Sequence, residues 1–179
     1  MRRRRRSDVH AVAAEVPSFA SVAERHLDDV HGYLRYLTGD RLLAEDLAAE
    51  TFEKALRLWP RFDPRRGSAR TWLCQIARTT ALDHFRAEQR RRRREGTYAL
   101  REEPIAEDGL FGEGLSPELE RALASLTAGE REVVVLRVVL DLDGETAARV
   151  LGISQTNCTT RLHRALRKLE ERMKSDVAA

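Results

Sequence analysis

The chain has 179 residues, of which 34% are charged and 42% apolar, and its net charge is only +3. This length suits one ordinary domain or two small ones, and because no apolar run approaches membrane-spanning length, no membrane association is predicted. The two Cys residues, Cys74 and Cys158, lie far apart, which excludes a disulfide framework and a zinc motif and predicts small buried side chains. Aromatic residues make up only 6%, and alternating Val/Ile/Thr-rich runs are scarce, so the chain is predicted to be all-α.

Charge is distributed unevenly along the sequence. Arg2–Arg6 is a basic run that no apolar segment follows, so residues 1–17 are predicted to be a disordered basic arm and the expected location is the cytoplasm. Six Arg stand against one Glu at 86–94, whereas residues 95–118 contain seven acidic side chains and one Arg. This segregation indicates a surface that meets nucleic acid and a separate acidic segment.

Two helices are predicted before the first Pro-rich loop. Ser21–Glu24 is a capping box, apolar residues follow it at helical spacing, and Gly39 provides a stop. Asp40 begins a second helix that runs to Trp59, where Pro60 ends it.

The second helix has a face on which only acidic side chains are charged. Its buried side is predicted to consist of Leu43, Leu47, Ala48, Thr51, Phe52 and Ala55, and the opposite arc contains Glu45, Asp46, Ala49, Glu50 and Glu53. Four like charges on one arc repel one another by a few tenths of a kcal/mol per pair. A solvated face is the alternative interpretation, but such faces usually mix signs. A docking surface for a basic partner explains the arc better.

The longest predicted helix follows a loop at 60–70 that contains four Arg. Ser68 is its N-cap, and neither Pro nor Gly interrupts the sequence through Arg94. Its apolar face comprises Leu73, Ile76, Ala77, Ala81 and Phe85, and its polar arc comprises Gln75, Arg78, Thr79, Asp83 and Arg86, with Trp72 at the edge. Cations for phosphate, polar groups for base edges and an indole for stacking suit single-stranded DNA. The alternative is a core helix with a solvated basic end.

The rest of the chain is predicted to be a second helical domain at 116–179, joined to the first, at 18–94, by a flexible acidic linker at 95–115. Ser116 caps a helix with Pro at its first position, and Thr127–Glu130 is a capping box that opens a helix through Leu140.

A helix-turn-helix pattern follows. Asp143 caps a short helix, Gly152 makes a tight turn, and Ser154 caps a last helix that reaches about Lys174. Its apolar side is predicted to contain Cys158, Leu162, Ala165 and Leu169, and its polar side Thr156, Asn157, Thr160, His163, Arg164 and Arg167. Small polar residues at the start suit base edges, and Arg further along suits phosphates. No metal or cofactor site is predicted, because no ligand cluster surrounds His163 in the sequence.

Four segments, in order, resemble one family. Thr38–Leu56 (TGDRLLAEDLAAETFEKAL), Phe62–Arg86 (FDPRRGSARTWLCQIARTTALDHFR), Leu123–Arg137 and Ala147–Leu169 resemble regions 2 and 4 of group 4, or extracytoplasmic-function (ECF), RNA polymerase sigma factors. The resemblance implies that the chain binds core RNA polymerase, at the largest-subunit clamp and the β-flap, and directs initiation at promoter DNA. It also makes an anti-sigma factor a candidate partner.

The resemblance assigns three groups of site residues. Polymerase-binding residues would be Asp46, Leu47, Glu50, Phe52 and Glu53. Residues that melt and read the minus-10 element would be Arg65, Arg66, Ser68, Arg70, Trp72, Gln75, Arg78, Thr79, Asp83 and Arg86. Residues that read the minus-35 duplex would be Gln155, Thr156, Asn157, Thr159, Thr160, Arg161, His163, Arg164 and Arg167.

Three positions depart from the family pattern: Thr79 replaces a frequent Asn, Gly144 a common aromatic residue, and Thr159 a frequent Lys.

A free-standing helix-turn-helix regulator is the alternative function, although the acidic arc and the Arg-rich loop argue against it. A nucleic-acid enzyme lacks support, because no metal-ligand cluster, nucleophile–base set or phosphate-binding Gly loop occurs in the sequence.

Overall fold

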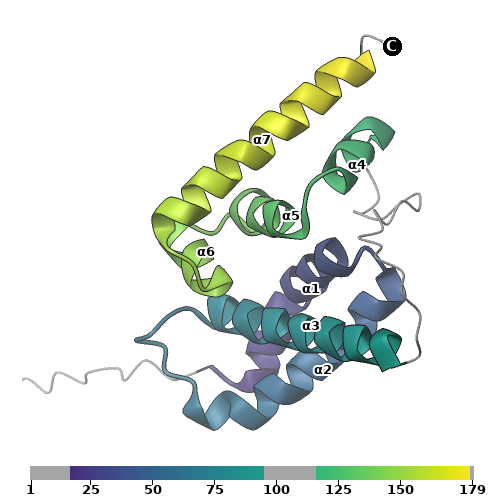
Figure 1. Cartoon of the computed structure of the whole chain (residues 1–179). Helices are drawn as coiled ribbons and strands as arrows, with labels where there is room; N and C mark the ends of the chain where they lie inside the picture. The colour runs from purple at the N-terminus through teal and green to yellow at the C-terminus, as the bar shows by residue number, and fades with distance from the viewer. Residues whose placement is uncertain (1–16, 95–115, 178–179) are drawn as a thin grey trace, which may run out of the picture.

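The computed structural model describes residues 17–94 and 116–177, and their secondary structure is helical, as predicted (Figure 1). The first half contains α1 (Phe19–Thr38), α2 (Arg41–Leu58), the 3₁₀ turn η1 (Trp59–Arg61) and α3 (Ala69–Arg94). The second contains α4 (Pro117–Ala124), α5 (Ala128–Val134), the π-helical turn η2 (Val135–Val139), α6 (Gly144–Leu151) and α7 (Gln155–Val177). No helix within the described ranges is long and apolar enough to cross a membrane. The predicted linker, and the predicted arm up to residue 16, lie outside the described residues.

Most helix starts have the caps that the sequence predicts. Asp40 accepts a hydrogen bond from the backbone N–H of Leu43 at 3.0 Å, and Asp143 accepts one from Thr146 at 2.9 Å. Thr127 and Glu130 form a reciprocal capping box. These side chains satisfy backbone donors that the first turn leaves without a helical partner.

The first helix begins earlier than predicted. Its N-cap is Ser18, whose hydroxyl oxygen accepts a hydrogen bond from the Ser21 backbone N–H at 3.2 Å, so Ser21–Glu24 lies within the helix and is not a capping box. The added turn has a packing reason: the Phe19 ring meets the Trp59 ring edge-on, with centroids 5.6 Å apart.

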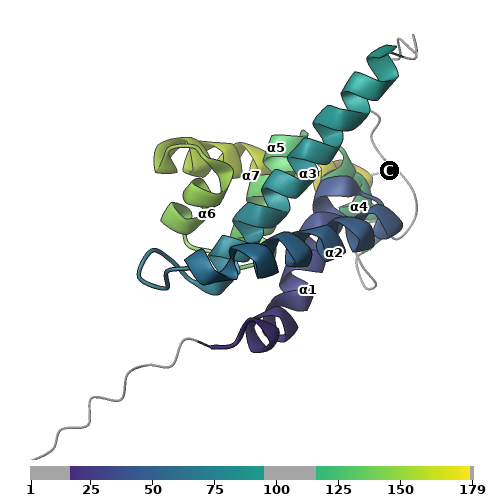
Figure 2. The same cartoon turned by 90° about the horizontal axis from the view of Figure 1, so that it is seen from below.

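The helices α1, α2 and α3 pack around a common core (Figure 2). It includes Val22, Val30, Leu34, Ala44, Leu47, Ala55, Leu73 and Ala77. Cys74 is also buried, as predicted. The C-terminal end of α3 extends beyond α1 and α2 (Figure 2). Phe85 of α3, predicted on the core face, is 38% exposed.

In the second half, α7 packs against α4, α5 and α6. Gly152 adopts the left-handed conformation (φ 67°) in the turn between α6 and α7, as the predicted helix-turn-helix requires. The helix predicted to run regularly through Leu140 instead ends in the π turn η2, in which the Leu140 N–H donates to the Val135 carbonyl at 2.8 Å. Val138 and Val139, within this turn, are exposed.

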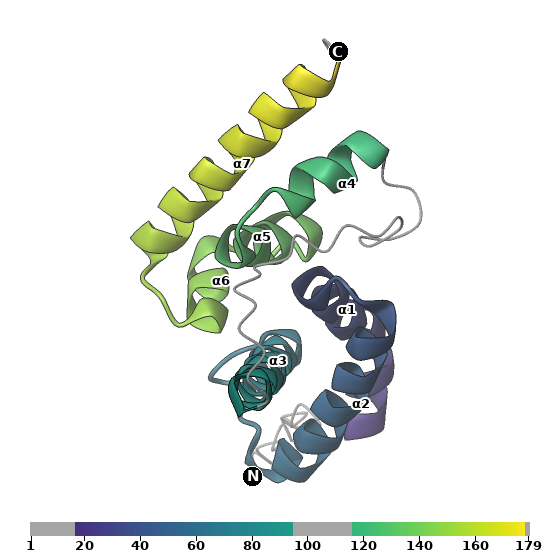
Figure 3. The same cartoon turned by 45° about the vertical axis from the view of Figure 1, so that its right-hand side comes forward.

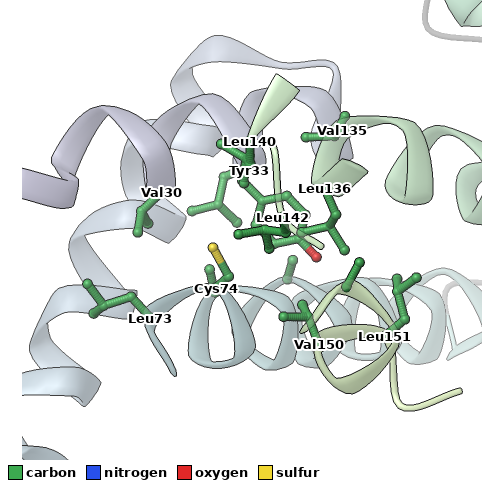
Figure 4. Packing of buried hydrophobic residues seen from close by; sticks show 14 of the residues in the cluster. Val30, Tyr33, Leu73, Cys74, Val135, Leu136, Leu140, Leu142, Val150 and Leu151 are labelled. Carbon is green, nitrogen blue, oxygen red and sulfur yellow. The ribbon is translucent and has the colours of Figure 1, made fainter. Parts of the chain in front are cut away.

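The two halves share a hydrophobic core, a contact that the sequence does not predict. Helix α1 contacts α5 and η2, and α3 contacts α6 (Figure 3). Val30, Tyr33 and Cys74 from the first half belong to one buried cluster with Leu136 and Leu151 from the second (Figure 4). The second half therefore covers part of the surface formed by α1 and α3.

Candidate polymerase and nucleic-acid interfaces

The outer face of α2 is exposed, as predicted, but it is not purely acidic. Glu45, Glu50 and Glu53 each form an ion pair within the helix, with Arg41 (3.0 Å), Lys54 (2.7 Å) and Arg57 (3.4 Å) respectively. Asp46 is exposed, and no ion pair is found for it among the described residues. These cations, four residues from their partners, reduce the repulsion that the sequence predicts among the acidic side chains.

Two apolar side chains that sequence reasoning missed lie within the same arc. Leu42 is 72% exposed and Leu56 is 56% exposed. At 3.6 residues per turn, they lie on the same side of α2 as Ala49 and Glu53. Exposed Leu side chains within a charged border are typical of a protein-binding surface. We call Leu42, Asp46, Ala49, Glu50, Glu53 and Leu56 the α2 surface.

Two residues assigned to polymerase binding do not belong to this surface. Leu47 is only 2% exposed, because it lies on the side of α2 that faces α1 and α3, so its side chain belongs to the core, on the predicted buried side of the helix. Phe52 is half-buried and packs against the same core.

The loop before α3 is held in shape by its own turn and by an aromatic cluster. Asp63 accepts a hydrogen bond from the Arg65 backbone N–H at 2.9 Å, and Arg65 and Arg66 are exposed. At the loop's N-terminal end, the Phe62 ring stacks on Trp59 with centroids 4.8 Å apart and also contacts Trp72 at 5.2 Å. Trp72, assigned to the minus-10 element, is therefore half-buried in this aromatic cluster. The sequence analysis does not predict the cluster.

Arg70 is bound to α1 instead of pointing freely into solvent. Its guanidinium donates a hydrogen bond to Asp29 at 2.8 Å, and the other Asp29 oxygen lies 2.9 Å from Nδ1 of His26. Burial raises the pKa of Asp29, but the hydrogen bonds and charges of His26 and Arg70 outweigh it and hold the pKa below its usual value. The residue predicted to contact DNA thus connects the start of α3 to α1. No sequence pattern indicates this partner, which lies 41 residues away along the chain.

The polar arc of α3 is divided in two. Thr79, Asp83 and Arg86 are exposed, as predicted. Arg78 is half-buried, and its Nε donates a hydrogen bond to Glu132 of α5 at 2.8 Å. Ser68 caps the helix with its hydroxyl, and Gln75 is half-buried.

Glu132 also accepts a hydrogen bond from the Tyr33 hydroxyl of α1 at 2.8 Å. Burial, reinforced by the neighbouring Glu132 carboxylate, raises the pKa of Tyr33 well above its usual value, so the phenol stays protonated and donates. The sequence analysis does not identify Tyr33 or Glu132 as functional residues, because helical periodicity places each of them on the core side of its helix.

The polar side of α7 is exposed, as predicted. Its exposed residues are Gln155, Thr156, Asn157, Thr159, Thr160, His163, Arg164 and Arg167. Arg161 is half-buried and lies over Gly129 at the start of α5, where an added Cβ would come within 3.0 Å of its guanidinium. A groove between α5 and α7 is lined by Thr127, Gly129, Glu130, Asn157, Thr160, Arg161 and Arg164.

The face of α7 is fixed to α5 by an ion pair. Lys168 Nζ lies 2.7 Å and 2.8 Å from the two oxygens of Glu130. Burial raises the pKa of Glu130, but the hydrogen bonds from Lys168 and Thr127 outweigh it, and the pKa lies below its usual value. Within 17–94 and 116–177, no group of three His, Cys, Asp or Glu side chains is placed to hold a metal ion.

The two halves match two family models. Sigma-70 region 2 matches residues 22–91, and Sigma-70, region 4 matches residues 116–169. ECF RNA polymerase sigma factor SigC of Mycobacterium tuberculosis is 35% identical over 169 residues, which cover 89% of this chain and 89% of SigC. The chain belongs to the ECF RNA polymerase sigma factors. The sequence-based family assignment is confirmed, and a free-standing regulator is not favoured.

Two other sigma factors also match most of the chain. SigX of Bacillus subtilis is 29% identical over 163 residues, covering 87% of this chain and 84% of SigX. A chain of the co-crystal structure of sigma factor RpoE with the anti-sigma factor NepR from Bartonella quintana superposes with a TM-score of 0.74 at 25% identity, covering 90% of this chain and 99% of that chain. These matches include both halves of the ECF sigma factor described here.

Proposed function

We propose that this ECF sigma factor divides promoter-specific initiation among three surfaces. The α2 surface docks on the largest-subunit clamp of core RNA polymerase, the Arg65–Arg66 loop and α3 read the opened minus-10 strand, and α7 reads the minus-35 duplex. The observation that supports this division best is a contrast between two exposed faces. The α2 surface combines apolar Leu side chains with carboxylates, whereas the face of α7 is basic and polar.

Recognition of the duplex precedes opening in this scheme. The first turns of α7 present Gln155, Thr156 and Asn157, whose short polar groups suit base edges in the major groove. Arg164 and Arg167 lie further along the helix and suit phosphates, which position the helix without reading sequence. The ion pair between Lys168 and Glu130 holds α7 against α5, so this face is presented by a rigid unit.

The minus-10 strand is bound only after melting. Extruding a base from the stack costs a few kcal/mol, which contacts in the protein must offset. The Arg65–Arg66 loop supplies cations from a preformed turn, and Arg86 continues the basic surface along α3. In this scheme the polymerase catalyses RNA synthesis, and this chain acts by binding polymerase and promoter DNA.

Three further roles complete the proposal. The acidic segment at 95–115 passes through the basic active-centre channel of the polymerase, and the second half also contacts the β-flap. The protein acts in the cytoplasm, where polymerase and promoter are found. An anti-sigma factor is a candidate regulator, which the similarity to the sigma factor RpoE in its complex with the anti-sigma factor NepR supports.

The docking role is tested by reversing charge on α2. Asp46→Arg with Glu50→Arg should abolish co-purification with core RNA polymerase, while far-UV circular dichroism stays unchanged because both side chains are exposed. Glu24→Arg with Asp28→Arg is the matched control, because it reverses two exposed acids at i and i+4 on α1. Retention of core binding by the α2 variant, or equal loss in the control, would refute the assignment.

A further inference from the structure

The contact between the halves is centred on one buried carboxylate. Glu132 of α5 is 7% exposed, and it accepts hydrogen bonds from Tyr33 of α1 and from Arg78 of α3, both at 2.8 Å. These partners lie 99 and 54 residues away along the chain. A buried carboxylate is costly unless charged or polar partners satisfy it, so Glu132 depends on the packed arrangement of the two halves.

Helix α6 extends the contact toward the minus-10 loop. Val150 and Leu151 of α6 lie against α3 in the shared core (Figure 4). A Cβ built on Gly67 would lie 3.8 Å from the guanidinium of Arg149, so this α6 side chain flanks the loop that presents Arg65 and Arg66. The second half therefore occupies space beside the proposed minus-10 surface as well as binding Arg78.

We propose that Glu132 is an internal competitor of promoter DNA, which holds Arg78 in a closed arrangement until the halves separate. This inference rests on the assignment of Arg78 to the minus-10 surface. Oε1 of Glu132 accepts the hydrogen bond from Nε of Arg78, so the carboxylate neutralises the guanidinium and holds it against α5, as a DNA phosphate would neutralise it in the open arrangement. Closure therefore competes with binding of the opened strand.

The competition has a thermodynamic consequence. If only the open arrangement binds the strand, the apparent affinity is reduced by the fraction of molecules that are open. By reciprocity, a bound strand favours the open arrangement to the same extent. Loss of one partner from a buried charge pair commonly shifts an equilibrium between two arrangements by about a hundredfold or more. Because Arg78 remains partly exposed, we expect the equilibrium between closed and open chains to shift by about tenfold.

Glu132→Gln tests the proposal, because it keeps the shape of the side chain and removes its charge. Small-angle X-ray scattering of the full chain should show a larger radius of gyration, and a random-sequence single-stranded deoxyoligonucleotide should bind about tenfold more tightly by fluorescence anisotropy. Glu24→Gln, which neutralises an exposed acid on α1, is the control for net charge and should change neither quantity. Equal behaviour of the two variants would overturn the proposal.

Two further variants separate this inference from the function on which it rests. Tyr33→Phe removes only the hydrogen bond from the Tyr33 hydroxyl to Glu132, so it should open the chain less than Glu132→Gln does. A Tyr33→Phe chain that stays fully closed would count against the proposal. Adding Arg78→Ala to Glu132→Gln should reverse the gain in affinity while the chain stays open. If the gain persists, Arg78 is not a DNA contact and its assigned function fails. If Glu132→Gln opens the chain without any gain, the competition itself is refuted.

Discussion

Replacing Arg70 by Ala should destabilise the first half of the molecule, although sequence reasoning placed this residue among the DNA contacts. The ion pair with Asp29 joins the first turn of α3 to α1, and the two side chains are only 28% and 25% exposed. Arg66 offers a matched comparison, because it is the same residue type four positions earlier and is exposed. Arg66→Ala should weaken DNA binding and leave stability unchanged.

The expected magnitude follows from the geometry of the pair. A hydrogen bond to a charged group contributes about 1.5–3 kcal/mol when it is shielded from water. Because about a quarter of each side chain remains exposed, and because His26 still contacts Asp29 after the substitution, we expect Arg70→Ala to lower the free energy of unfolding by about 2 kcal/mol. A double-mutant cycle with Asp29→Asn should give a coupling energy of about 1 kcal/mol.

Urea unfolding followed by far-UV circular dichroism measures both quantities. The measurement compares five proteins: wild type, Arg66→Ala, Arg70→Ala, Asp29→Asn and the Asp29→Asn/Arg70→Ala double variant. The reasoning would be refuted if Arg66→Ala and Arg70→Ala had the same midpoint and slope, or if the cycle gave a coupling energy below about 0.3 kcal/mol, which is within the scatter of independent sites.

Three other outcomes are expected. Thr79→Ala should lower permanganate reactivity of thymines in the minus-10 region and leave closed-complex formation intact, whereas Arg164→Ala should weaken duplex binding; the reverse pattern would contradict the division between α3 and α7. The folded-state pKa of Glu130 lies below its usual 4.5, so its stabilising contribution is complete above pH 4.5 and is lost as the pH falls further. Glu130→Gln should therefore show a flatter dependence of stability on pH during acid unfolding. Parallel curves for wild type and variant would exclude the ion pair with Lys168 as the cause. Limited proteolysis should cut first within 95–115, and the fragments should elute together because the halves share a core; resistance throughout that range would refute its assignment as a linker.

Local chemistry explains what the sequence predicts well. A cap needs only a side chain and a backbone N–H two or three residues away, so Asp40, Thr127 and Asp143 can be identified without knowledge of the fold. The turn at Gly152 and the exposed faces of α2 and α7 follow from equally local rules. The sequence predicts too late a start for the first helix, because its extra turn is accompanied by a contact between distant residues, Phe19 and Trp59.

The candidate site was harder to predict, because helical periodicity gives the faces of a helix and not the element that covers each face. Arg70 and Arg78 both lie on polar arcs, yet their partners, Asp29 and Glu132, come from other helices. Leu47 was assigned through family resemblance to a docking helix as a whole, although its own position on that helix is buried. Only the packing of the two halves identifies Glu132 as a shared residue.

The central claim is that this chain gives core RNA polymerase its promoter specificity. Run-off transcription with purified core polymerase, on a library of promoter sequences, tests it most directly. We expect discrete transcripts from a subset of templates, dependent on the chain and absent with the Asp46→Arg/Glu50→Arg variant. Transcripts that form equally without the chain, or duplex binding by the chain with no transcription from any bound template, would contradict the account.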